Sequence, residues 1–136
     1  MTLLRWIAVG YTIVLAAAAA LNYIPGLTDE HGRSFGVFAL DIFDDALHVA
    51  SASWAAVAAW TSHRASKIFL RYFGLLYFID GVMGLFVGSG YLDLGIVHYG
   101  VQDLPLTFKI LANTPHIGLG GFALLASFFL DRPTTS

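Results

Sequence analysis

The sequence predicts an all-α protein, a four-helix transmembrane bundle that forms a single integral-membrane domain over residues 1–136. The composition is 57% hydrophobic and only 12% charged, whereas about one quarter of a soluble domain is charged. Four apolar runs of about 20 residues follow one another, and a helix of that length spans a bilayer core of roughly 30 Å. The two halves of the chain also resemble each other.

The four apolar runs are predicted as helices over residues 5–24, 42–60, 68–88 and 110–130. The second is acidic at its start, and the third carries only Arg71 and Asp80 as charged side chains. Arg5 followed by the alanines of residues 16–20 also resembles a secretory signal peptide. The first apolar run is longer than a usual signal core, which favours an uncleaved helix.

Lys and Arg predict the orientation of these helices, because short cytoplasmic loops carry an excess of them. One side would hold Arg5, Arg64, Lys67, Arg71 and Arg132, and the other Arg33 and Lys109. We therefore expect both termini in the cytoplasm of a bacterial cell, with the chain in its cytoplasmic (inner) membrane.

An internal repeat is indicated by two matches between the halves. Residues 5–11 match residues 71–77 at an offset of 66, and residues 45–48 match residues 113–116 at an offset of 68. Each unit has two helices, so both units have the same orientation and form a parallel repeat of two helix pairs. Residues 113–116 also have the pattern of a helix start, with Pro115 at the first helical position.

Small residues are frequent on the third and fourth predicted helices, where they allow close backbone approach in lipid. They predict either tight packing within the bundle or an interface with a second copy or a partner. The glycines concerned are Gly74, Gly81, Gly84, Gly88, Gly118, Gly120 and Gly121.

Asp80 lies inside a predicted membrane helix, where a carboxylate is costly and usually faces a partner or a cavity. Counting at 1.5 Å per residue places Asp80 about 12 Å, His48 about 10 Å and His116 about 9 Å below the outer boundary. The three could therefore meet in one layer. A structural Asp–His hydrogen bond, a proton relay or ligand site, and a protonated Asp80 bonded elsewhere are the alternatives.

The densest polar cluster consists of Asp41, Asp44, Asp45 and His48, whose spacing puts them on one helix face. Carboxylates with an imidazole suit a divalent metal such as Zn, Mn or Fe, but acids at a helix start also cap free N–H groups. His48 and His116 on two helices could alternatively ligate a non-covalent haem b. His31, His63 and His98 are expected in solvated loops or turns.

Several function classes are excluded or disfavoured. The net charge of −2 argues against a nucleic-acid binder, and the lack of cysteine excludes thiol chemistry and disulfides. We find no phosphate-binding loop or catalytic motif, and the short cytoplasmic segments leave no room for a nucleotide. The chain is therefore not expected to be an enzyme, and no cofactor is required by its sequence.

The stretch from Phe35 to His48, the turn at residues 24–26, the helix of residues 72–77 and the second Asn-x-x-His at residues 113–116 resemble a bacterial four-span membrane family. That family is catalogued as domain of unknown function four-three-eight-three. Asn is usual there in place of Asp41 and Asp45, and His in place of Asp44, so this chain is more acidic. The resemblance implies a fold and a membrane location, and no activity.

These features together predict a small multi-pass membrane protein that is an accessory or structural subunit. It would pack in the lipid bilayer against itself or a larger membrane complex. The alternatives are a haem- or metal-binding protein that uses His48 and His116, and a proton pathway around Asp80.

Overall fold

The computed structural model describes residues 1–27, 29–30 and 42–132, and every regular element in these ranges is helical. Four helices are long, and they cover Leu3–Ala20 (α1), Ile42–Thr61 (α2), His63–Val87 (α3) and Leu106–Phe129 (α5). A 3-10 turn, η1 (Leu21–Tyr23), extends α1, and the short helix α4 (Gly95–Tyr99) lies between α3 and α5. The all-α prediction is confirmed for this part of the chain.

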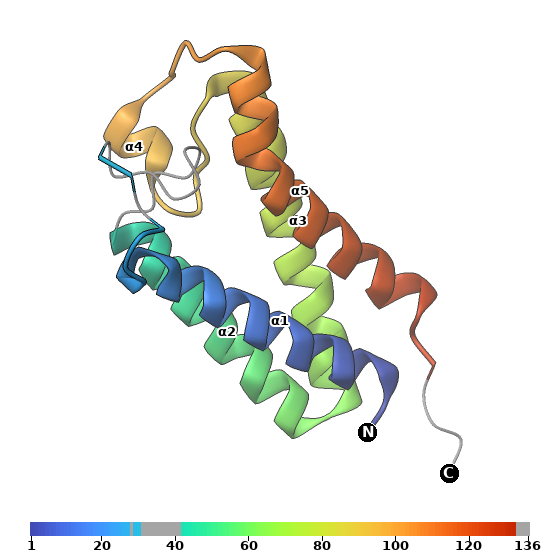
Figure 1. Cartoon of the computed structure of the whole chain (residues 1–136). Coiled ribbons are helices and arrows are strands. Elements are labelled where there is room, and N and C mark those ends of the chain that lie inside the picture. The colour runs from blue at the N-terminus through green and yellow to red at the C-terminus, as the bar shows by residue number, and fades with distance from the viewer. Residues whose placement is uncertain (28, 31–41, 133–136) are drawn as a thin grey trace.

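The long helices pack in two pairs, α1 with α2 and α3 with α5 (Figure 1). The first half of α3 also contacts α1 and α2, while α4 lies at the opposite end of the molecule (Figure 1). The start of α1, the turn between α2 and α3 and the end of α5 come together, because His63 contacts both Thr2 and Asp131. We call this the terminal end, and the end with α4 the α4 end.

Glycine allows α3 and α5 to approach each other closely. A Cβ on Gly74 would lie 2.5 Å from the backbone N of Leu124, and one on Gly81 would lie 2.9 Å from the N of Ile117. Gly84 faces the side chain of Asn113, and Gly120 faces the backbone of α3. Gly118 has open space around it.

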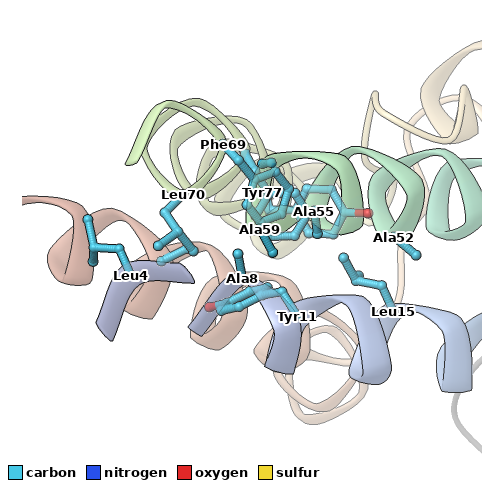
Figure 2. Close-up of a cluster of buried hydrophobic side chains, with 13 residues drawn as sticks. Leu4, Ala8, Tyr11, Leu15, Ala52, Ala55, Ala59, Phe69, Leu70 and Tyr77 are labelled. Carbon is cyan, nitrogen blue, oxygen red and sulfur yellow. The ribbon is translucent and has the colours of Figure 1, made fainter. Parts of the chain in front are cut away.

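The apolar core lies where α1, α2 and α3 meet (Figure 2). Tyr11 of α1 packs edge-on against Phe69 and Phe73 of α3, at ring-centroid distances of 6.1 and 5.4 Å. The alanines of α2 let these rings sit close to its backbone, and Ala55 is fully buried. Arg5 donates to the carbonyls of Ala59 and Trp60, so a cation closes the C-terminal end of α2.

Two helix starts differ from the predicted positions. α3 begins five residues early, at His63, because the Ser62 side chain accepts a hydrogen bond from Ala65 N and caps the helix. α5 begins at Leu106, four residues before the predicted start at residue 110, and it contains Pro115 in its interior, so the helix-start pattern of residues 113–116 is wrong. The Thr114 hydroxyl and the Asn113 amide bond back to the carbonyls of Ile110 and Lys109 in this turn.

Two of the described helices, α1 and α3, are long and apolar enough to cross a membrane. The helices α2 and α5 carry polar residues at the α4 end, including His48 and Asn113, and these lower their apolar character. The four-span arrangement and the internal repeat stay predictions.

Asp131 follows α5 and pairs with side chains of α3. We expect this pairing to make the stability of the fold depend on pH. Lys67 and His63 lie 2.5 and 2.7 Å from its carboxylate and hold the pKa of Asp131 below its usual value. Because the pKa of Asp131 is depressed in the folded chain, its ion pairs contribute to stability above the unfolded pKa of about 3.9. This contribution is lost as pH falls through the folded pKa. The pair is partly exposed, so we expect at most about 1 kcal/mol.

The measurement is a comparison of thermal unfolding of the native chain and Asp131→Asn between pH 7 and pH 3. The native chain should be the more stable at pH 7, and the two should converge toward pH 3. A difference that stays constant over this range would contradict the pairing.

Candidate functional site

A polar cavity of about 300 Å³ lies at the α4 end, between the start of α2, the end of α3 and the start of α5. The segment of residues 88–104, which includes α4, contributes part of its lining. The lining includes six residues with a carboxylate, imidazole or ammonium group, namely Asp44, His48, Asp80, Asp93, Lys109 and His116. The structure thus brings together His48, Asp80 and His116, the three residues that depth alone had placed in one layer.

Asp80 is 3% exposed and is surrounded by hydrogen-bond donors. Its Oδ1 accepts from the backbone N–H groups of Tyr91 and Leu92, at 2.8 and 3.0 Å. The chain can wrap so closely because residue 90 is glycine: a Cβ there would lie 2.8 Å from Asp80 Cγ. The carboxylate therefore ties the segment after α3 back onto α3.

His116 completes this arrangement from α5. Its Nδ1 lies 2.6 Å from Asp80 Oδ2, and since a carboxylate only accepts, Nδ1 carries the donated proton. In the neutral imidazole this leaves a lone pair on Nε2. The ring also packs against Tyr77, at a centroid distance of 4.8 Å and an interplanar angle of 43°, so its orientation is held from two sides.

His48 stands beside this pair from α2 and is 7% exposed. Its ring lies edge-on to His116, with centroids 6.3 Å apart. Within the described ranges, His48 Nδ1 and Ser89 Oγ are buried and have no hydrogen-bond partner. Leaving such a group unpaired costs about 1–3 kcal/mol. Both residues line the same cavity, so a molecule bound there could pair with them.

Toward the terminal end, the buried polar side chains of the described residues form separate hydrogen bonds and do not line the cavity. Below His116, Tyr77 shares a hydrogen bond with Ser51 at 3.2 Å, and the Tyr11 hydroxyl donates to the carbonyl of Leu119. Beyond these, the described residues form the apolar core around Phe69 and Leu4. The site therefore has the form of a polar cavity closed on one side by the core.

The acidic cluster predicted as a metal site is divided between two places. Asp44 lines the cavity with His48, whereas Asp45 accepts a hydrogen bond from the Tyr23 hydroxyl at 3.1 Å. Asp41 lies outside the described residues. In the described ranges no group of three or more His, Asp or Glu side chains is arranged to hold a metal ion.

The other histidines have different environments from those expected. His63 is the first residue of α3, and its two ring nitrogens contact Thr2 and Asp131, so it is not simply solvated. His98 lies on α4 and packs against Phe43 at a centroid distance of 4.5 Å. His31 lies outside the described residues.

Sequence reasoning missed the part of the site that follows α3. Ser89, Asp93 and Lys109 line the cavity but carried no recognisable motif. The signal that could have revealed them is the Gly88-Ser89-Gly90 turn, since glycines after a helix allow the backbone to approach a buried group closely. Gly88 has a φ of 82° and ends α3 in the left-handed conformation.

Comparison with family models, curated proteins and solved structures finds no match to this chain. The resemblance to the four-span family stays a prediction.

Proposed function

We propose that this chain is a multi-pass protein of the bacterial cytoplasmic membrane that binds a small polar ligand in the cavity at the α4 end. The observation that carries the proposal is the pair of buried, unpartnered polar atoms, His48 Nδ1 and Ser89 Oγ, which line one cavity. Groups of this kind are nearly always paired in folded proteins. A ligand that pairs with both recovers part of the cost of burying them.

Apolar side chains on the outer surface support the membrane location. Large side chains that are at least 64% exposed occur on each long helix, namely Ile13, Val57, Phe86 and Phe129. In water such an all-round apolar surface would be unfavourable, whereas lipid covers it without cost. We propose four spans, built as a parallel repeat of two helix pairs, with the terminal end in the cytoplasm and the cavity open to the outside.

The ligand is neutral or cationic and small. Asp44, Asp80 and Asp93 supply three carboxylates to the lining, against the single ammonium group of Lys109. A volume of about 300 Å³ is at the lower end of known ligand pockets. The carboxylates of the lining are hydrogen-bond acceptors, so a ligand with at least one hydrogen-bond donor fits the cavity.

The proposal assigns no catalysed reaction to the chain. The chain would act as an accessory or structural subunit that packs against a second copy of itself or against a larger membrane complex. The glycines Gly74, Gly81, Gly84 and Gly120 are used within the chain, between α3 and α5. An interface with a partner would therefore use other surfaces of the helices. Haem, a metal ion and a bound proton are the alternative occupants of the cavity.

Native mass spectrometry of the chain taken from its own membrane in mild detergent tests the proposal. We expect an additional small mass on the native chain. His48→Leu should reduce its retention about tenfold, because one hydrogen bond in a desolvated site is lost. His98→Leu is the matched control, since His98 is outside the cavity lining, and it should retain the ligand.

A chain without any added small mass, or equal retention in the two variants, would count against the proposal. The mass of haem or of a metal ion would instead establish one of the alternative occupants.

A further inference from the structure

A second hollow lies at the terminal end, on the far side of the apolar core from the cavity. It has a volume of about 460 Å³ and is lined by the first turns of α3 and by Asp131. Arg64, Lys67 and Arg71 line it at the spacing i, i+3 and i+7, which places all three on one face of the helix. Three cationic side chains therefore share the hollow with one carboxylate.

The carboxylate offsets only part of this charge. Asp131 pairs with Lys67 at 2.5 Å and with His63 at 2.7 Å. Arg64 is exposed and forms no hydrogen bond or ion pair with another residue in the described ranges. The hollow thus keeps an excess of positive charge.

Arg71 is held in place while part of its guanidinium stays available. Its Nε and Nη2 donate to the side chain and carbonyl of Ser127, at 3.4 and 3.2 Å, and the group lies 4.0 Å above the Phe128 ring. A guanidinium has five N–H donors, so donors remain for a further acceptor. Because the side chain is already ordered, binding an anion costs little additional entropy.

Apolar side chains border the cationic groups on the same helix. Ile68 and Tyr72 line the hollow and are 42% and 56% exposed. Tyrosine is enriched where membrane helices meet the interface, with its ring near the headgroups. The hollow therefore combines an anion-binding part with an apolar part.

We propose that this hollow binds an anionic phospholipid, with the lipid phosphate at Arg64 and Arg71 and the glycerol and upper acyl chain along Ile68 and Tyr72. Basic pockets on the cytoplasmic side of membrane helices bind such headgroups. This proposal rests on the membrane location and orientation proposed above, and it is independent of what occupies the cavity at the α4 end. The apolar border favours a lipid over free phosphate.

The test is a lipid titration of the purified, delipidated chain, followed by native mass spectrometry. Phosphatidylglycerol and phosphatidylcholine with the same acyl chains are compared, and inorganic phosphate is added as a competitor. We expect the native chain to prefer phosphatidylglycerol. Arg64→Gln should weaken this binding about fivefold, the effect of one cationic side chain at a membrane surface.

Arg132→Gln is the matched control, because it removes the same charge from the same end without lining the hollow. It should leave phosphatidylglycerol binding unchanged. Equal loss in the two variants, equal binding of the two lipids, or displacement by inorganic phosphate would each overturn the lipid site. Recovery of the chain in the soluble fraction without detergent would instead overturn the membrane location itself.

Discussion

Asp80→Ala should destabilise the fold by about 3–5 kcal/mol, the largest single effect that the structure predicts. The substitution removes the acceptor for the Tyr91 and Leu92 N–H groups and for His116 Nδ1. Removing one partner of a buried charged pair leaves the others desolvated and unpaired, which gives a loss of this size. Thermal or denaturant unfolding in detergent measures it.

Asp80→Asn separates the two sets of hydrogen bonds that the carboxylate accepts, those from the backbone N–H groups after α3 and the one from His116. The amide oxygen can still accept from the two backbone N–H groups, but the NH₂ group then faces His116 Nδ1. A neutral His116 would then accept through Nδ1 and carry its proton on Nε2. We expect an intermediate loss of stability and a changed tautomer of His116 in nitrogen NMR.

Asp103→Asn is the control for the charge change, because Asp103 is an exposed residue of the segment between α4 and α5. It should unfold like the native chain. If Asp80→Ala were as stable as Asp103→Asn, the carboxylate would not hold the segment after α3 in place.

Gly74→Ala should destabilise the contact between α3 and α5 by about 3 kcal/mol. The new methyl group would lie 2.5 Å from Leu124 N and 2.7 Å from the Gly120 carbonyl oxygen. Both are backbone atoms, so the helices must move apart, and overpacking of this kind costs about 1–3 kcal/mol or more. The measurement is the unfolding temperature in the same detergent.

Gly118→Ala on α5 is the matched control, because no atom lies within 4 Å of a Cβ at that position. It should be neutral, or stabilising by up to about 1 kcal/mol from helix propensity. Similar unfolding temperatures for the two variants would show that the backbones of α3 and α5 are not in contact at Gly74.

The sequence was sufficient to predict the long helices and to place three residues of the site at a similar level along them. Apolar runs of helical length located all four long helices, and counting residues along them placed Asp80, His48 and His116 at similar depth. Depth depends only on the rise per residue. The direction in which each side chain points depends on how the helices pack against one another. The sequence therefore could not predict whether the three side chains would meet.

The parts that were not predicted depend on contacts between distant residues. Arg5 indicated a membrane flank in the sequence, yet its side chain closes the end of α2. Pro115 indicated a helix start, because the preference of proline for the first turn is local, whereas α5 packs along α3 through this position. The segment after α3 folds back because Asp80 accepts its N–H groups.

The proposed lipid site depends on the placement of the two ends on opposite sides of a membrane, and so does the proposed opening of the cavity to the outside. The chain has no cysteine, so single cysteines can be introduced without background labelling. Asp103→Cys marks the α4 end and Thr61→Cys marks the terminal end, and both positions are exposed. Right-side-out membrane vesicles are treated with a membrane-impermeant maleimide.

We predict that Asp103→Cys is labelled in intact vesicles, and that Thr61→Cys is labelled only after the membrane is permeabilised. Labelling of both cysteines in intact vesicles, or the reverse pattern, would contradict the placement of the two ends on opposite sides of the membrane.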